Sequence, residues 1–439
     1  MFKYPYPTIV VPGITASYLQ DDYTLPPETV WSVLTRSYER AALHPDNPLY
    51  EATEPARVVA GQLFEVAYKE LIEELRYNLR EKEDLPVPVF PFSYDWRQPL
   101  QLTELQLAAF VKEVIARTKL LRHYDHEGYD KESKVNLVGH SMGGLIIAGY
   151  LERSGKSHPV HKVATLATPF QGSFEAVIKI TTGTANLGPE VPSSREREAA
   201  RLTPALYHLL PSFQNGLDVA EGLPRSLFEP QVWQTSIIDT LKEYIRLHGL
   251  AKADRANQAR ELFESLLKAA ERHRARIDAF RLDAVGLKAA QWLCVVGVDA
   301  DTRVRLKVEK SGRAAAFSFG SEDRHNMWSN PDAKLRRLTG DGTVPFEGAV
   351  PKFLAPESLV CVTPDDFGYW ELQDKALMKA AGFHGILPNM DMLHRLLVAH
   401  LTGKTPRHEN AWGRPAPGVS EWKPPIDGLR HKNGDAPGG

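Results

Sequence analysis

Short apolar segments rich in β-branched residues recur along this chain of 439 residues, and they constrain its fold more than any other feature. Each is bounded by Gly, Pro or Asp, as is typical of parallel strands buried on both faces. Between them lie amphipathic patterns, as in residues 63–79 and 105–121, where apolar residues return every three or four positions. Strands that alternate with helices predict a mostly parallel central sheet flanked by helices. The expected strands are residues 8–11, 87–92, 135–138, 163–167, 292–298 and 359–362.

The alternation of strands and helices stops between residues 174 and 285, which are polar, punctuated by proline and mostly helical in pattern. Apolar side chains of residues 262–270 share one helical face, which is typical of a helix that packs on a core. We therefore predict a large helical cap, residues 174–285, inserted into an α/β core formed by residues 1–173 and 286–402. Residues 403–439 are rich in Pro, Gly and charge, which predicts an irregular, partly disordered tail.

The composition argues against several classes of partner. The chain has 53 Lys and Arg against 55 Asp and Glu, a formal net charge of -2, so we expect no nucleic acid and no charge-driven membrane binding. Nothing resembles a phosphate-binding loop or a metal-ligand cluster, so we expect neither a cofactor nor a metal. Cys294 and Cys361 lie in apolar strand-like segments, where buried thiols are expected rather than a disulfide.

The first residues lack the basic and apolar segments of a secretory signal, and no stretch reaches the roughly 18 apolar residues that span a bilayer. We therefore expect a cytoplasmic protein. Any contact with a membrane surface should be transient and made through the cap. The sequence does not predict the oligomeric state.

An apolar strand and the start of a helix are joined by the turn Gly139-His140-Ser141-Met142-Gly143. Such an elbow forces the serine into a strained backbone conformation, which glycines two residues before and after it tolerate best. The Ser141 hydroxyl is thereby presented at the end of the strand as a nucleophile. The following helix directs the Met142 amide toward the oxyanion of a tetrahedral intermediate. We interpret His140 as a structural neighbour, because adjacent residues on an elbow point away from one another.

The acid and the base of such a site follow the serine along the chain, in loops after later strands. Asp341 lies between two glycines just before an apolar residue and a proline, a setting suited to a tightly held carboxylate that orients an imidazole. A plain Gly-Asp-Gly turn is the alternative. Asp365 and Asp366, which follow the last expected strand, are competitors for the same role.

The expected base is His384, which lies in a loop just ahead of the helical pattern of residues 392–401. A histidine there can take the proton of Ser141 and return it to a leaving group. His394 and His400 fall inside the helix, where we expect histidines with a structural role.

The first expected strand ends in a Pro12-Gly13 turn, whose following amides provide the second oxyanion donor in this architecture. The chain also contains the motifs Val11 to Ile14 with Ser17, Tyr94-Asp95-Trp96-Arg97, the elbow with Gly144, Ala167 to Ser173, Thr203 to Pro211 and Gly340 to Pro345. Through these motifs it resembles the lecithin:cholesterol acyltransferase-like family of lipases, phospholipases and acyltransferases, in the α/β-hydrolase superfamily. The resemblance spans about residues 8–400. It implies an α/β-hydrolase fold, Thr15 as the oxyanion amide with Ile14 as the alternative, and Asp341 and His384 as acid and base.

We expect a serine esterase or lipase that hydrolyses carboxylic esters, of lipids or phospholipids, through an acyl-enzyme on Ser141. An O-acyltransferase is the alternative, since it shares the first half-reaction and passes the acyl group to an alcohol in a drier site. A catalytically silent binding protein of the same fold is a third possibility, against which the serine, acid and base argue. The substrate is a lipid or another ester, and the sequence identifies no substrate-binding residue.

Overall fold

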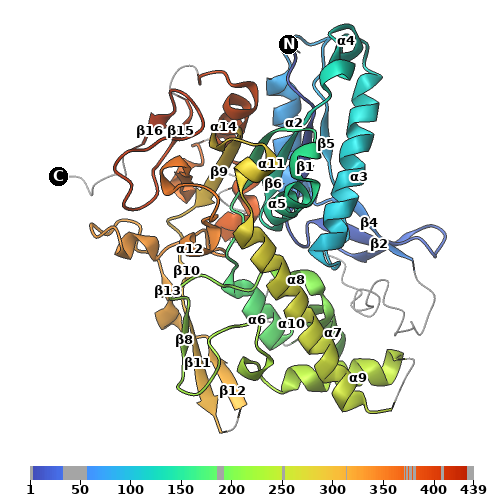
Figure 1. The fold of residues 1–439 in the computed structure, drawn as a ribbon, viewed down its shortest axis with the longest axis vertical. Helices are drawn as coiled ribbons and strands as arrows, with labels where there is room; N and C mark the ends of the chain where they lie inside the picture. The colour runs from blue at the N-terminus through green and yellow to red at the C-terminus, as the bar shows by residue number, and fades with distance from the viewer. Residues whose placement is uncertain are drawn as a thin grey trace.

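A six-stranded sheet forms the centre of the protein, and it contains all six strands expected from the sequence (Figure 1). Its order is β14-β9-β7-β6-β1-β5, and every pairing within it is parallel. The predicted fold class, a mostly parallel sheet flanked by helices, is confirmed. The strands are β1 (Thr8–Val11), β5 (Val89–Pro91), β6 (Val135–His140), β7 (Val160–Leu166), β9 (Trp292–Gly297) and β14 (Val360–Val362). The computed structural model describes residues 3–32, 57–184, 192–249, 253–312, 314–369, 371, 374, 378, 382–406 and 410–432.

The two faces of the sheet are covered by different helices, because successive strand residues point to opposite sides. Val10 and Val138 share a buried cluster with residues of α2 and α14. Ile9 and Leu137, one position earlier in each strand, share the other cluster with residues of α3 and α5. Both faces of β1 and β6 are therefore buried. The helices are α2 (Glu65–Leu79), α3 (Leu100–Lys119), α5 (Met142–Ser154) and α14 (Asp391–Thr402).

The register of the central strands brings the site together. Val11 at the end of β1 pairs with Gly139 of β6, and His140 pairs with Leu166 of β7. The turn after β1 and the elbow after β6 therefore leave the sheet at the same level and at the same edge. The carboxyl ends of parallel strands are where α/β folds bind their ligands.

The segment predicted as a cap carries most of the remaining helices, and α6, α7, α8, α9 and α10 lie together below the central sheet in Figure 1, whereas α11 lies beside β6. It also contributes a short strand, β8, that the sequence did not predict. This strand pairs with β11, which lies beyond the predicted cap, and β12 completes a small separate sheet. The elements are α6 (Phe174–Thr182), α7 (Ser194–Leu202), α8 (Pro204–His208), β8 (Leu217–Val219), α9 (Ser236–His248), α10 (Arg255–Ala279), α11 (Leu282–Val285), β11 (Leu306–Ser311) and β12 (Ala314–Ser318).

Shorter elements complete the architecture. Strand β2 follows the turn after β1 and pairs in antiparallel fashion with β3 and β4, so this small sheet continues directly from the site edge. Further strands and α-helices are β2 (Ser17–Asp21), β3 (Glu28–Trp31), β4 (Val58–Leu63), α4 (Arg122–His126), β10 (Thr302–Arg303), β13 (Arg324–His325), α12 (Phe346–Ala349), β15 (Trp412–Gly413) and β16 (Arg430–His431).

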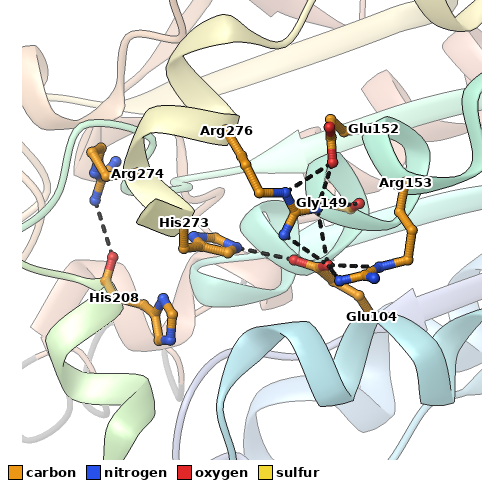
Figure 2. A network of polar contacts seen from close by, with 8 residues as sticks. All are labelled: Glu104, Gly149, Glu152, Arg153, His208, His273, Arg274 and Arg276. Atoms are coloured by element: carbon orange, nitrogen blue, oxygen red, sulfur yellow. Dashed lines mark hydrogen bonds and ion pairs between the residues drawn. The ribbon is translucent and has the colours of Figure 1, made fainter. Parts of the chain in front are cut away.

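A buried cluster of ionic residues links α10 to the core helices α3 and α5 (Figure 2). Glu104 of α3 is fully buried, and its carboxylate accepts hydrogen bonds from His273 at 3.0 Å and Arg276 at 3.2 Å, both on α10. Arg153 of α5 reaches the same carboxylate at 3.1 Å. Burial alone raises the pKa of Glu104, but the hydrogen bond from His273 and the charge of Arg276 bring the pKa below its ordinary value. The carboxylate therefore remains charged and joins three helices.

Replacing Glu104 by glutamine is expected to lower the free energy of unfolding at pH 7 by about 2–3 kcal/mol, because it leaves desolvated cations without their counter-charge. Because the folded-state pKa of Glu104 lies below 4.5, its contribution is complete above that pH and is lost as the pH falls through the folded value. Urea unfolding at several pH values should show the two proteins converging in acid.

The matched control for Glu104→Gln is Glu113→Gln on the same helix. Glu113 pairs with Arg117 at 2.7 Å, but its side chain is 48% exposed, so its loss should cost less than about 0.5 kcal/mol. Equal effects of the two substitutions would contradict the role given to the cluster.

Between residues 410 and 432, the C-terminal segment contains only the two-residue strands β15 and β16. It is nevertheless attached to the core. Arg414 binds both carboxylate oxygens of Asp366, just after β14, and the Trp412 indole donates to the same carboxylate at 2.7 Å. Of the tail predicted to be partly disordered, residues 403–439, residues 407–409 and 433–439 lie outside the described residues.

Both cysteines are free and buried, as predicted. Burial raises the pKa of Cys294 and of Cys361 to about 12, so both remain neutral thiols in the interior. Within the described ranges, no helix has the length and apolarity to cross a bilayer.

Candidate active site

The elbow between β6 and α5 holds Ser141 in the strained conformation that the sequence predicts. Its φ is 53° and its ψ is -127°, although it is not a glycine. The flanking glycines allow α5 to pack directly on the sheet. A Cβ atom on Gly143 would lie 2.1 Å from the Val11 carbonyl oxygen, and one on Gly139 would lie 2.8 Å from the Gly144 nitrogen. Larger residues at either position would push the helix away from the strand.

A continuous series of hydrogen-bonding contacts joins Ser141 to His384 and His384 to Asp341. The Ser141 Oγ atom is 2.9 Å from His384 Nε2, and His384 Nδ1 is 2.7 Å from Asp341 Oδ2. Because a carboxylate accepts, the Nδ1 atom carries the proton and Nε2 is left to accept the serine hydroxyl. Only 7% of Ser141, 9% of His384 and 1% of Asp341 is exposed, so little water reaches these hydrogen bonds.

The carboxylate of Asp341 is held by the turn in which it lies. Its Oδ1 atom accepts from the amides of Thr343 at 3.0 Å and Val344 at 2.7 Å, which leaves Oδ2 for the imidazole. A Cβ atom on Gly297, at the end of β9, would lie 2.7 Å from the Asp341 Cβ atom. The Gly-Asp-Gly turn therefore exists, and it presents the carboxylate.

The local structure around His384 differs from the expected open loop, because residues 382–386 form a helical turn. Phe383, Ile386 and Leu387 recur at helical spacing and are buried in the cluster under α2 and α14. The turn is thus fixed by apolar packing. The amide of His384 also donates to the Asp341 carbonyl at 3.1 Å, which joins acid and base through the backbone.

The competing residues do not contact Ser141, and three of them have partners elsewhere. Asp366 binds Arg414, and Asp365 is exposed. His394 and His400 are buried on α14 and donate to the carbonyls of Pro388 at 2.7 Å and Val163 at 3.0 Å. The structure brings Asp341 and His384 to Ser141 and gives Asp366, His394 and His400 other contacts.

The loop after β1 approaches the nucleophile closely. A Cβ atom on Gly13 would lie 3.0 Å from the Ser141 Cβ atom, and Thr15 has a positive φ of 59°. The Gly13 amide donates to the Tyr68 hydroxyl at 2.9 Å. Among the described residues, no acceptor pairs with the amides of Ile14, Thr15 or Met142. Their role as oxyanion donors stays a prediction.

The Tyr94 to Arg97 motif has a structural role that the sequence alone does not reveal. The Tyr94 hydroxyl lies 2.8 Å from the Pro12 carbonyl oxygen and 3.0 Å from that of Gly13, and the Trp96 indole donates to the Ser17 carbonyl at 3.1 Å. Both aromatic residues are buried. The motif therefore holds the loop after β1 from behind.

Two residues that contact this site were not predicted to do so. Tyr68 on α2 binds the Gly13 amide, although its position in an amphipathic helix indicates only a core residue. His140, predicted as a structural neighbour, binds the Tyr68 hydroxyl at 2.7 Å and the His384 carbonyl oxygen at 3.0 Å. Among the described residues, no group of three or more His, Cys, Asp or Glu side chains could hold a metal ion.

Comparison with known proteins agrees with the motif-based resemblance. Residues 58–240 match the family model described as lecithin:cholesterol acyltransferase. A search of curated proteins gave no significant match.

A solved structure shares the fold. A chain in the crystal structure of the Tle4–Tli4 complex has a TM-score of 0.54 at 16% identity, covering 79% of this chain and 89% of that one. Two others match less well. The lipase BlEst2 of Bacillus licheniformis has a TM-score of 0.23 at 18% identity over 47% of this chain and 54% of its own. The phospholipase PlaB of Legionella pneumophila has a TM-score of 0.27 at 10% identity over 72% of this chain and 49% of its own.

The likeness to the Tle4–Tli4 chain concerns the fold alone. The family match indicates, at the level of the family, a lipid esterase or acyltransferase. The chain therefore has an α/β-hydrolase fold, and its residues 58–240 are similar to the lecithin:cholesterol acyltransferase family.

Proposed function

We propose that this protein is a serine esterase or lipase that hydrolyses carboxylic esters of lipids or phospholipids through an acyl-enzyme on Ser141. The observation that carries the proposal is the line of contacts from Ser141 Oγ to His384 Nε2 at 2.9 Å and from His384 Nδ1 to Asp341 at 2.7 Å. A nucleophile, a base and an orienting acid in this geometry are the requirements for acyl transfer. The family match supports a lipid ester as the substrate class.

In the first half-reaction, Ser141 Oγ attacks the ester carbonyl carbon while His384 Nε2 takes the hydroxyl proton. Asp341 accepts the hydrogen bond of Nδ1 and stabilises the imidazolium that forms. The carbonyl oxygen becomes an oxyanion, to which the amides of Thr15 and Met142 donate. The tetrahedral intermediate then collapses, the alcohol leaves with the proton from His384, and the acyl group remains on Ser141.

In the second half-reaction, water attacks the acyl-enzyme and gives its proton to His384 Nε2. Collapse of the second intermediate releases the carboxylic acid and returns the proton to Ser141 Oγ. An alcohol in place of water would yield an ester, and the family match makes this O-acyl transfer the second candidate. The low exposure of Ser141 and His384 fits a site where water and alcohol compete.

Mass spectrometry of the products separates these fates and the substrate class together. The whole protein is incubated with mixed acylglycerols and phospholipids, with and without a long-chain alcohol, and Ser141→Ala serves as the matched control. Free fatty acid in both mixtures supports hydrolysis, and a new alkyl ester in the alcohol mixture indicates acyl transfer. If no lipid or simple ester yields products beyond those of the control, the proposal is wrong.

A further inference from the structure

A chain of hydrogen bonds runs behind the catalytic line, from the loop after β1 to the backbone of His384. The Gly13 amide donates to the Tyr68 hydroxyl at 2.9 Å, and that hydroxyl lies 2.7 Å from His140 Nδ1. His140 Nε2 in turn lies 3.0 Å from the His384 carbonyl oxygen. We call the two side chains in the middle, Tyr68 and His140, the Tyr–His bridge. Both are buried, so water does not compete for these bonds.

The direction of every bond in the Tyr–His bridge is fixed by chemistry. A backbone amide can only donate, so the Tyr68 oxygen accepts from Gly13 and has its single proton left to give. That proton goes to His140 Nδ1, which must therefore be unprotonated. The proton of His140 is then on Nε2, where it donates to the His384 carbonyl, a group that can only accept. One tautomer of a neutral imidazole satisfies all three bonds.

The surroundings keep His140 neutral. Burial, and next the charge of His384, hold its pKa well below the ordinary value. The two imidazole rings lie 5.1 Å apart, centre to centre. A cationic His140 would oppose the imidazolium that forms on His384 during acyl transfer. It would also leave the Tyr68 proton without its acceptor.

From this geometry we propose that Tyr68 and His140 are positioning residues for acyl transfer. They fix His384 relative to the loop after β1, residues 12–16, which we call the oxyanion loop. The inference rests on the proposed function of Ser141. The bridge joins the two parts that must be aligned in the transition state, the base and the amides that follow Gly13. A displacement of about 1 Å in such a site costs about a hundredfold in rate.

Packing alone does not require these polar groups. A buried imidazole or phenol is costly unless its polar atoms are satisfied, and an apolar side chain would fill the same space at no such cost. His400 illustrates the ordinary alternative, since its Nε2 donates to the carbonyl of Val163, on strand β7. His140 differs because its partners are the catalytic histidine and, through Tyr68, the oxyanion loop.

The test uses three variants of the whole protein: Tyr68→Phe, which removes only the hydroxyl, His140→Phe, which removes both nitrogens, and His140→Gln, which keeps a donor near Nε2. We expect kcat to fall about 10- to 100-fold in the two phenylalanine variants with little change in KM. His140→Gln should recover part of that loss. The double variant should be no worse than about twofold below the slower single variant, because both changes break the same chain.

Two control variants separate positioning from a general effect on the fold. Tyr124→Phe removes a buried hydroxyl that donates to the Pro5 carbonyl at 2.7 Å, and His400→Gln alters a buried histidine that binds a carbonyl. Both should keep the wild-type kcat. Thermal unfolding of every variant gives the folded fraction, to which each rate is normalised. A fall in kcat that disappears on this normalisation would overturn the proposal.

Nitrogen-15 NMR of labelled histidine tests the hydrogen-bond directions in the Tyr–His bridge. At neutral pH, the resonances assigned to His140 by their absence in His140→Gln should show a protonated Nε2 and an unprotonated Nδ1. The opposite tautomer would overturn the bridge as described. If wild-type protein reacts with a fluorophosphonate probe and both phenylalanine variants react equally fast, the inference fails while the proposed function stands. If wild-type protein does not react at Ser141, the proposed function itself fails.

Discussion

Ser141→Ala is expected to lower turnover of an ester substrate at least about a thousandfold, because it removes the only atom that attacks the carbonyl carbon. The remaining rate would come from the oxyanion amides and from substrate binding. The substitution deletes one oxygen and leaves the Cβ atom against Gly13 in place. The serine and alanine also bear the same backbone strain at a φ of 53°.

For these reasons the thermal midpoint of Ser141→Ala should lie within about 2 °C of the wild-type value. Steady-state kinetics on a chromogenic ester, combined with thermal unfolding, checks both halves of this prediction. A variant that folds normally and keeps a rate near that of the wild-type protein would end the assignment of Ser141 as the nucleophile.

Asp341→Asn is expected to lower kcat by about ten-thousandfold, because it forces the wrong tautomer on His384. The amides of Thr343 and Val344 both donate to Oδ1, so the asparagine oxygen must occupy that position. The amino group of the asparagine then faces His384 Nδ1. Because this group donates, Nδ1 can bind it only as an acceptor, that is, when Nδ1 carries no proton. The proton moves to Nε2, and His384 can no longer accept the proton of Ser141.

The control for Asp341→Asn is Asp366→Asn, which changes another buried carboxylate. Asp366 pairs with Arg414 and not with His384, so its loss should alter stability but not the kcat of the folded protein. Kinetics on both variants, normalised to folded protein, checks the pair. A loss of kcat confined to Asp366→Asn would show that the acid had been assigned to the wrong strand end.

The parts of the fold that could be predicted from the sequence are those written in local patterns. All six central strands were predicted because each is a short apolar segment between turn residues, a pattern that requires no knowledge of its neighbours. The elbow is local as well, since glycines 139 and 143 flank the serine that they make room for. Asp341 and His384 could be placed because chain order in this architecture limits where the acid and the base can lie.

The contacts that could not be predicted join residues far apart in sequence. Tyr68 is 55 positions from Gly13 and 72 from His140, and a tyrosine on the apolar face of a helix has the same pattern whether or not its hydroxyl has a role. Glu104 is 169 positions from His273. The strand β8 has only three residues and no buried position, so its pairing with β11 left no recognisable apolar pattern.

The helical turn around His384 was missed for a different reason. Phe383, Ile386 and Leu387 do follow helical spacing, but the segment is too short for periodicity to distinguish it from a loop. What forms the turn is burial of these side chains between α2 and α14, which is a tertiary contact. His384 was therefore predicted in an incorrect local structure.

Covalent labelling of Ser141 tests the central claim most directly, because it requires the nucleophile, the base and the oxyanion donors to act together. The folded protein is treated with a fluorophosphonate probe and digested, and the modified residue is identified by mass spectrometry, with Ser141→Ala and heat-unfolded protein as controls. The account predicts a single stoichiometric adduct on Ser141 that is absent from both controls. Folded wild-type protein that remains unmodified, or an adduct on another serine, would contradict it.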